Sequence, residues 1–257
     1  MNNTLVTKQL EDNIWTFNEA VETTGPQMDA YLVTGSKKAV MIDTLQDETH
    51  LYSKVRELTK LPIDVLITHG HRDHCGIAAK DFFNDGCPVY MDERDNPLMK
   101  AQGWDTAMFK PLRAGDIFDL GGYKLETIAL PGHTPGSAVF LEREKQHLYT
   151  GDATGAGVFW MQIPNARPLS EFRSYLGKLW EEVKDMKNLK LLTGHRHQAP
   201  IHDLEFLKDT IYVTDKILSG EMKGEPKEMK MHDGKILHCM TVKYKTITDY
   251  AYNSENL

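Results

Sequence analysis

The stretch Val65-Leu66-Ile67-Thr68-His69-Gly70-His71-Arg72-Asp73-His74 joins a short apolar run to a dense group of ionisable side chains. Its last six residues include four side chains of the kinds that bind metal ions: His69, His71, Asp73 and His74. In a dry interior, so many imidazole and carboxylate groups would repel one another or lack hydrogen-bond partners. A bound cation removes this conflict, because zinc and similar metals take neutral imidazole and ionised carboxylate as ligands. The stretch therefore predicts a metal site directly after a buried strand.

Three further ionisable residues follow other predicted strands, and a glycine comes immediately before each of them. They are His133 in Pro131-Gly132-His133, Asp152 in Thr150-Gly151-Asp152 and His195 in Thr193-Gly194-His195. Functional loops of α/β sheets gather at the carboxyl ends of the strands, so we expect these side chains to meet the first cluster at one rim. The cluster and the strand-end pattern together predict seven metal ligands.

Other segments carry ordinary signals of regular structure. Tyr31 to Val33 and Ala39 to Ile42 are expected to pair as a hairpin, and Leu51 to Leu58 to form a helix. Two amphipathic helices are predicted in the C-terminal half, the first capped by Ser170 and the second by Asp203. A β-hairpin is expected at about 227–250, because Asp233-Gly234 is a typical hairpin turn.

The composition is that of an ordinary globular protein, and we expect one domain over residues 1–257. A net charge of -7 gives no electrostatic footprint for nucleic acid. No apolar stretch approaches the roughly 20 residues that span a bilayer, and the first residues lack a signal-peptide pattern. Three scattered cysteines do not make a disulfide framework, so we expect a reducing, cytoplasmic setting without nucleic-acid or membrane partners. The oligomeric state stays open, a homodimer included.

The order and spacing of these residues resemble those of the metallo-β-lactamase-fold hydrolases. The HxHxDH motif of that family matches residues 69–74, and its later histidine, aspartate and histidine match His133, Asp152 and His195. Its aspartate at the end of an early strand matches Asp43 in Met41-Ile42-Asp43-Thr44. The resemblance implies an α/β protein with a four-layer αβ/βα sandwich and a metal site on one edge, between two sheets.

The resemblance also implies two divalent metal ions, with the ligand set of glyoxalase II. One ion would be held by His69, His71 and His133, and the other by Asp73, His74 and His195, with Asp152 bridging them. Two such ions can share a hydroxide that is nucleophilic near neutral pH. Asp73 would also be the catalytic residue that orients the hydroxide, and Asp43 would support a ligating histidine. Zinc is preferred, although iron and manganese suit this ligand set as well.

Function is predicted only to the level of a reaction class. The main hypothesis is a dinuclear hydrolase that attacks an ester, thioester, lactone or related small-molecule substrate. The alternatives are a mononuclear iron sulfur dioxygenase of the same fold and a phosphodiesterase. Antibiotic hydrolysis is not expected, because the β-lactamases of this family do not usually carry the bridging aspartate that Asp152 matches.

Several residues near the predicted site are tempting but carry weaker signals. Tyr149 and Tyr175 are candidates for a lactonase tyrosine by position only, and Phe159 to Met161 could wall a pocket or pack in the core. His197 and His202 are expected to be surface or supporting residues. Cys75, beside His74, and Cys239, beside His238, are expected to be structural, because neighbouring residues on a helix or strand point in different directions.

Overall fold

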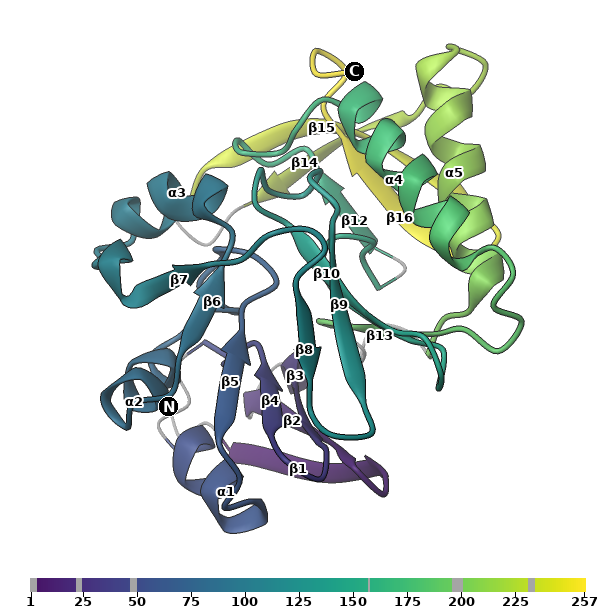
Figure 1. Ribbon diagram of the computed structural model, residues 1–257. Helices are drawn as coiled ribbons and strands as arrows, with labels where there is room; N and C mark the ends of the chain where they lie inside the picture. Colours follow the sequence, from purple (N-terminus) through teal and green to yellow (C-terminus); the bar gives the residue numbers. More distant parts are fainter. Residues whose placement is uncertain (1–3, 22–24, 47–49, 157, 196–200, 231–233) are drawn as a thin grey trace.

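The computed structural model describes residues 4–21, 25–46, 50–156, 158–195, 201–230 and 234–257. Two large sheets lie face to face, and helices cover the outer side of each sheet (Figure 1). This is the four-layer αβ/βα sandwich that the resemblance to the metallo-β-lactamase-fold hydrolases implied. No helix in the described ranges is long and apolar enough to cross a membrane.

The first sheet has seven strands, and their order in space follows their order in the chain: β1 (Thr4–Glu11), β2 (Ile14–Val21), β3 (Gly25–Thr34), β4 (Ala39–Ile42), β5 (Ile63–Leu66), β6 (Val89–Met91) and β7 (Phe109–Pro111). Strands β1 to β4 pair antiparallel, whereas β4 to β7 pair parallel. Its outer face is covered by three helices: α1 (Leu51–Leu58), α2 (Ala78–Asn84) and α3 (Asn96–Ala101). The β3–β4 hairpin and the bounds of α1 agree with the prediction.

The second sheet has five strands, in the order β13 (Lys190–Thr193), β11 (His147–Gly151), β10 (Ala138–Glu142), β9 (Lys124–Ala129) and β8 (Ile117–Asp119). A third sheet of four strands has the order β12 (Val158–Met161), β16 (Ile247–Tyr252), β15 (Ile236–Tyr244) and β14 (Glu225–Lys230). Two long helices cover this half: α4 (Leu169–Val183) and α5 (Leu204–Leu218). The C-terminal strands thus form part of a sheet that also includes β12 from the middle of the chain, paired parallel to β16.

Three buried apolar clusters separate the four layers. One lies between the first sheet and α1 to α3, a second fills the space between the two large sheets, and the third packs under α4 and α5. The apolar face predicted for α4 is buried, and Phe172 and Leu176 on it are both fully inaccessible. Because apolar side chains from both large sheets meet in the middle cluster, the two sheets cannot slide without exposing it.

The two helix caps had different outcomes. Asp203 caps α5 as predicted, since its carboxylate accepts a hydrogen bond from the Glu205 amide at 3.0 Å. The prediction for Ser170 was wrong. The helix α4 begins at Leu169, with Pro168 in the cap position two residues before Ser170, and the Ser170 hydroxyl donates to the Leu257 carbonyl instead. Because the helix starts at Leu169, this apolar side chain is buried, with 1% of its surface exposed. The free energy gained from that burial exceeds what a serine cap at the surface would contribute.

Candidate metal centre

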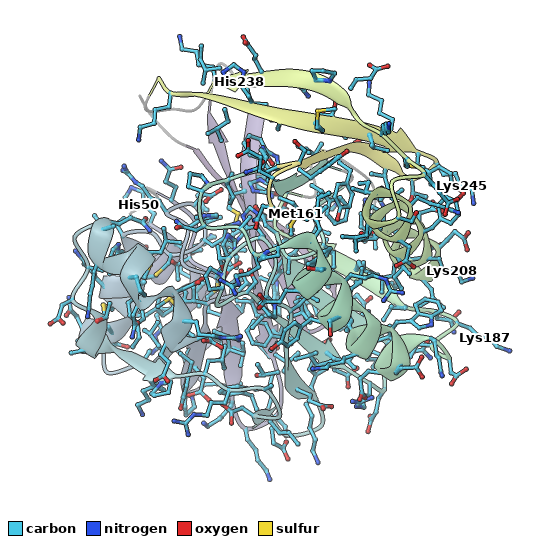
Figure 2. All side chains as sticks on the ribbon, turned by 90° about the horizontal axis from the view of Figure 1, so that it is seen from above. His50, Met161, Lys187, Lys208, His238 and Lys245 are labelled. Carbon is cyan, nitrogen blue, oxygen red and sulfur yellow. The ribbon has the colours of Figure 1, made fainter. Side chains whose placement is uncertain are left out.

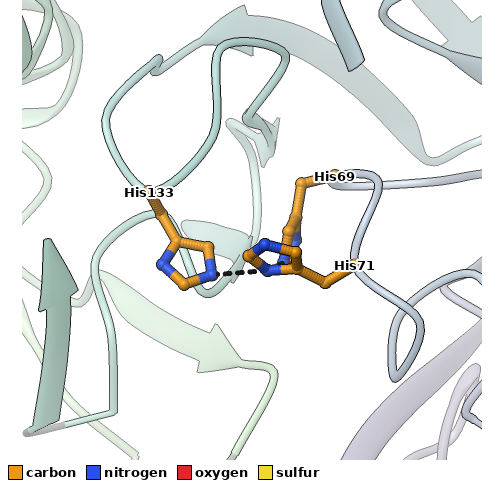
Figure 3. A group of neighbouring side chains, drawn as sticks. All are labelled: His69, His71 and His133. Atoms are coloured by element: carbon orange, nitrogen blue, oxygen red, sulfur yellow. Dashed lines mark hydrogen bonds between the residues drawn. The ribbon is translucent and has the colours of Figure 1, made fainter. Parts of the chain in front are cut away.

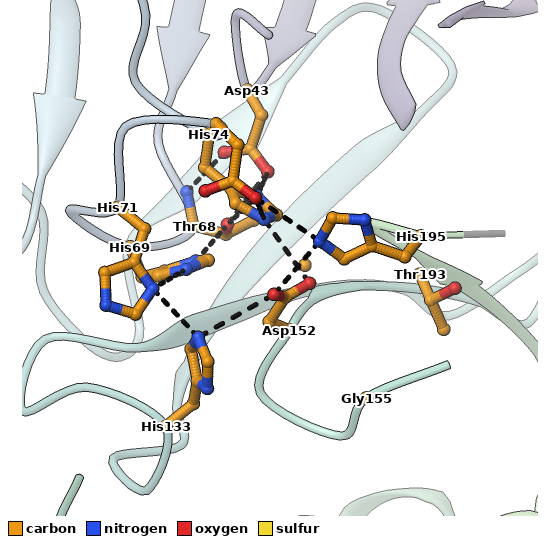
Figure 4. Close-up of polar contacts among 12 residues, drawn as sticks. Asp43, Thr68, His69, His71, His74, His133, Asp152, Gly155, Thr193 and His195 are labelled. Atoms are coloured by element: carbon orange, nitrogen blue, oxygen red, sulfur yellow. Dashed lines mark hydrogen bonds and ion pairs between the residues drawn. The ribbon is translucent and has the colours of Figure 1, made fainter. Parts of the chain in front are cut away.

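All seven predicted ligands lie in the described part of the chain and form two adjoining groups after strand ends of the two large sheets. Figure 4 labels six of them, all except Asp73. Each ligand follows a strand that ends at the edge where these groups lie. The 69–74 segment comes after β5 of the first sheet, whereas His133, Asp152 and His195 come after β9, β11 and β13 of the second. Loops from opposite sheets therefore face each other across the edge, as expected for a site between two sheets.

A buried carboxylate, Asp43, fixes the first loop. One of its oxygens accepts from the Thr68 amide at 2.8 Å, and the other accepts from the Thr68 hydroxyl at 2.8 Å. The Nδ1 atom of His74 donates to the same second oxygen at 2.7 Å (Figure 4). The Thr68 hydroxyl lies 3.1 Å from Nδ1 of His69, so it accepts from that ring while donating to Asp43. One carboxylate therefore sets the tautomer of two histidines and leaves both Nε2 atoms for a cation.

Three imidazoles form the first group of possible ligands, His69, His71 and His133. Nδ1 of His71 lies 3.0 Å from Nε2 of His69 and 2.9 Å from Nε2 of His133 (Figure 3). Nδ1 of His133 donates to the Trp160 carbonyl at 3.0 Å, which turns its Nε2 toward the other two rings. Tetrahedral zinc with bonds of about 2.0–2.1 Å would need ligand atoms about 3.3 Å apart, so this spacing suits one ion.

The second group mixes carboxylates and imidazoles: Asp73, His74, Asp152 and His195. Nε2 of His195 lies 3.4 Å from Asp73 Oδ2 and 3.2 Å from Asp152 Oδ2. Nε2 of His74 lies 3.3 Å from Asp152 Oδ1. Asp152 also reaches the first group, since its Oδ2 atom is 3.7 Å from Nε2 of His133. The structure thus puts Asp152 between the two groups.

One atom in this centre indicates that the residues fit a cation. Nε2 of His74 is buried, and no described residue forms a hydrogen bond with it, although an Asp152 oxygen lies 3.3 Å away. Nδ1 of the same ring is already used by Asp43. Nε2 therefore has ion-pair contacts with Asp152 and Asp73 in place of a hydrogen bond, and a metal ion among these atoms would give it a direct bond.

The two groups differ in their protonation. Burial holds the pKa of His69 well below its usual value and lowers the pKa of His133 to about 4. Burial also acts on His74, but the carboxylates of Asp152, Asp43 and Asp73 overcome it and raise the pKa of His74 to about 10. The same balance raises the pKa of His195 well above its usual value. Without a cation, the first group is neutral and the second is an ion-pair network.

Two glycines allow the loops to approach this closely. A Cβ atom on Gly194 would lie 2.5 Å from Cε1 of His74 and 2.8 Å from an Asp152 oxygen. Gly151 has a φ of +48°, and a Cβ atom there would lie 2.4 Å from the Thr68 hydroxyl. The glycine before each strand-end ligand was visible in the sequence, and at these two positions it has a steric reason.

No pattern in the sequence points to the residues that hold the His195 loop. The Tyr31 hydroxyl donates to the Thr193 carbonyl at 2.6 Å, and the Asp29 amide donates to the Gly194 carbonyl at 2.7 Å. Both residues belong to β3 of the first sheet, so the second-sheet loop that carries His195 is fixed from the opposite sheet. Only their spatial proximity reveals this role.

Several residues that were considered at the sequence level lie away from the centre. Tyr149 is fully buried between the sheets, and its hydroxyl pairs with that of Tyr123 at 3.1 Å. Phe159 and Met161 are core residues, and Met161 lies in the middle of the molecule in Figure 2. The ring of His202 stacks on Phe206.

The remaining candidates from the sequence are one further histidine and two cysteines, one of them beside His238. His197 lies outside the described residues. Cys75 is buried, and burial raises the pKa of its thiol far above the usual value, so it is not a reactive thiolate. His238 points outward on β15 (Figure 2) with 76% of its side chain exposed, whereas Cys239 is buried. The expectation that both cysteines are structural agrees with these positions.

Comparisons with known proteins agree with the geometry. Residues 23–195 match the sequence profile of the metallo-beta-lactamase superfamily. The hydroxyacylglutathione hydrolase GloC of Haemophilus influenzae is 32% identical over 153 residues, which cover 54% of this chain and 72% of GloC. The human acyl-coenzyme A thioesterase MBLAC2 is 25% identical over 225 residues, which cover 73% of this chain and 80% of MBLAC2.

Solved structures support the same architecture. A metallo-beta-lactamase from Pontibacter korlensis superposes with a TM-score of 0.65 at 19% sequence identity, covering 82% of this chain and 99% of that structure. The metallo-beta-lactamase DIM-1 gives a TM-score of 0.63 at 16% identity. At such low identity, these likenesses show the fold alone.

Proposed function

Because the chain belongs to the metallo-beta-lactamase superfamily and is a metal-dependent hydrolase, we propose that it hydrolyses thioesters with two divalent metal ions. The observation that carries this proposal is the position of Asp152. Its two oxygens lie 3.2–3.7 Å from nitrogen atoms of three histidines that belong to both ligand groups. A carboxylate in that position suits a bridge between two ions.

The residues would divide between the ions as the two groups divide in space. His69, His71 and His133 would hold one ion, and Asp73, His74 and His195 the other, with Asp152 between them. When bound, two divalent cations lower the pKa of water and polarise a carbonyl oxygen. All of these ligands offer nitrogen or oxygen atoms, which zinc accepts readily. We therefore propose zinc as the native metal.

Asp73 is the residue proposed to handle the proton of the attacking water. Its side chain is 34% exposed, compared with 15% for Asp152, so solvent reaches Asp73 more easily. Its Oδ2 atom lies 3.4 Å from Nε2 of His195, so the two side chains face the same point. Asp73 would orient the water toward the thioester carbonyl carbon and accept one proton as the new C–O bond forms. The C–S bond then breaks, and the thiolate leaves to be protonated in solvent.

Thioesters are preferred over the other substrates because of two relatives. Both GloC and MBLAC2 carry names that describe thioester cleavage, of an acylglutathione and an acyl-coenzyme A respectively. The two names differ in the thiol part of the substrate. We therefore propose cleavage of a thioester bond without choosing between glutathione and coenzyme A as the thiol. A cytoplasmic location fits the three free cysteines and is part of the proposal.

The test has two parts. Metal content of the chain purified without added metal should be about two ions per chain. The same protein should release free thiol from acyl-coenzyme A or S-acylglutathione, followed with a thiol reagent, faster than it cleaves lactones or phosphodiesters. The variant His238→Ala is a matched control, because it loses an exposed histidine outside both ligand groups.

The outcomes discriminate between the candidate reactions. A single iron per chain together with oxygen consumption on a sulfur substrate would favour the dioxygenase alternative. Cleavage of phosphodiesters in preference to thioesters would favour a phosphodiesterase. Two ions with no thioester cleavage would leave the metal centre standing and contradict the substrate class.

A further inference from the structure

Asp95 is a fully buried carboxylate that belongs to neither ligand group. It is the last residue of the short 3-10 helix Glu93–Asp95 and has an exposed fraction of 0%. One of its oxygens accepts from the Gly70 amide at 2.8 Å and from the Thr134 hydroxyl at 2.7 Å. The other oxygen accepts from the Gly136 amide at 2.6 Å. Three donors thus converge on one side chain.

These donors come from two loops that carry possible metal ligands. Gly70 lies between His69 and His71 on the first-sheet side, whereas Thr134 directly follows His133 on the second-sheet side. The Asp95 carboxylate therefore joins the loops that supply the whole three-histidine group, at a point behind the ligands. It contacts backbone and hydroxyl groups of these loops, so its effect on the imidazoles is indirect.

The packing around Asp95 is close at two glycines, and it is tightest at Gly136. A Cβ atom on Gly136 would lie 2.6 Å from Cγ of Asp95, and one on Gly70 would lie 3.1 Å from its Cβ. The Gly70 carbonyl is also held, by the side-chain amide of Gln102 at 2.7 Å. The turn between His69 and His71 is thus fixed at both its amide and its carbonyl by residues flanking α3.

An ordinary helix-capping role does not account for Asp95. It occupies the position before α3, where an aspartate normally accepts from the helix amides, but its side chain makes no such bond. The 3-10 helix is capped by another residue, Asp92, whose carboxylate accepts from the Arg94 amide at 2.9 Å. The carboxylate of Asp95 is turned away from its own helix and toward the ligand loops.

We propose that Asp95 is a positioning residue that sets the distance between the His69–His71 turn and the His133 loop, and so tunes metal affinity of the three-histidine group. This inference rests on the proposed function only in requiring that the group binds a divalent ion. Residues that orient ligands from behind typically change metal affinity 10–100-fold when they are replaced. The effect should fall mainly on the three-histidine group, because Asp95 contacts Gly70, between His69 and His71, and Thr134, next to His133, whereas its hydrogen bonds do not reach the Asp73–His74 end of the first loop.

The substitution Asp95→Asn tests this directly. An amide has one acceptor oxygen, so an asparagine that still accepts from Gly70 and Thr134 must point its NH₂ group at the Gly136 amide, a donor against a donor. We expect one of two zinc ions to bind about 10–100-fold more weakly, measured by competition with a chromophoric chelator. Cobalt substitution should give a changed absorption spectrum for that ion.

Asp209→Asn is the matched control. Asp209 is equally an aspartate with 2% exposure, but on α5 its carboxylate accepts from the Thr246 hydroxyl at 2.7 Å, outside both ligand groups. Both variants should lose thermal stability, and only Asp95→Asn should lose metal affinity. Should Asp95→Asn fail to fold, Thr134→Val removes a single donor to the same carboxylate and is expected to weaken the same ion.

The result that would overturn the inference is a folded Asp95→Asn protein whose two zinc affinities lie within about twofold of the wild type. An equal loss of affinity in Asp209→Asn would overturn it as well, because general destabilisation would then explain the change. A wild-type chain that binds two ions but cleaves no thioester would contradict the proposed substrate and leave the role of Asp95 intact.

Discussion

The two ligand groups of the centre lie side by side, but their buried polar side chains differ in charge. In the three-histidine group, the imidazoles are neutral, and burial lowers the pKa of His69 and His133. In the mixed group, Asp73 and Asp152 pair with His74 and His195, and the pKa values of both histidines are raised. The first group is therefore ready for a cation at neutral pH, whereas the second must lose protons before its imidazoles can ligate.

This difference suggests distinct roles. A neutral, rigidly supported group favours permanent binding of an ion. A group that contains two carboxylates and the more exposed Asp73 is suited to exchanging protons with water. Asp152 couples the two, because its oxygens approach histidines of both groups.

The largest effect is expected for Asp152→Ala, which removes the residue shared by both groups. At least one ion per chain should be lost, and thioester hydrolysis should fall by more than about 100-fold, beyond the range seen for residues that only support ligands. Metal analysis and steady-state kinetics measure both. Normal turnover in this variant and in His69→Ala and His133→Ala would contradict the site assignment.

A smaller loss is expected for Asp43→Asn, which acts on both groups from behind. Its carboxylate orients His74 directly and His69 through the Thr68 hydroxyl. We expect both zinc affinities to fall about 10–100-fold, in contrast to Asp95→Asn, where one should fall. Isothermal titration with zinc would distinguish the two patterns, and an effect on only one ion would show that Thr68 does not transmit the change.

Acidification should separate the groups without any mutation. The raised pKa of His74, about 10, means that this ring is protonated at pH 7 in the metal-free protein. Each proton displaced on binding lowers affinity about tenfold per pH unit. The pKa of His133, about 4, means that no proton is displaced from this ring. On lowering the pH from 8 to 6, affinity for the mixed group should therefore fall steeply and that for the three-histidine group little.

Zinc titrations over this pH range would check that affinity for the mixed group falls on acidification. Proton release on binding can be measured in two buffers of different ionisation enthalpy. Equal slopes for the two ions would mean that the groups are coupled into one unit. In that case, the difference in protonation would have no separate consequence for binding.

The smallest effect is expected for Tyr31→Phe. It removes one hydrogen bond, from the Tyr31 hydroxyl to the Thr193 carbonyl, and leaves the ring packing in place. A net loss of about 0.5–1.5 kcal/mol corresponds to roughly a 2- to 10-fold change, which should appear in the affinity of the ion near His195. An equal change at both ions would indicate a general loosening of the sheets instead.

A feature of this structure could be predicted from the sequence when the residues that determine it lie close together in the chain. The strand-end ligands could be predicted, because each sits within a few residues of an apolar run and a glycine that are visible locally. The α4 start could not, because the burial of Leu169 depends on tertiary packing that outweighs the local capping preference of Ser170. Asp203, with no such competition, was predicted correctly.

The residues that hold the ligand loops in place could not be predicted from the sequence. Asp95 and Tyr31 look like any aspartate or strand tyrosine in the sequence, and only the fold brings them to the ligand loops. The parallel pairing of β12 with β16 is of the same kind, since it joins the middle of the chain to its final strand. Such contacts link distant segments and leave no periodic pattern.

That last pairing has a consequence for the order of events during synthesis. The Trp160 carbonyl that orients His133 belongs to β12, and Trp160 lies opposite Ala251 of β16 in the third sheet. A ribosome releases β16 after every ligand has already emerged. We therefore expect all the ligands to have emerged before the third sheet is complete, and metal binding to be one of the last steps of folding.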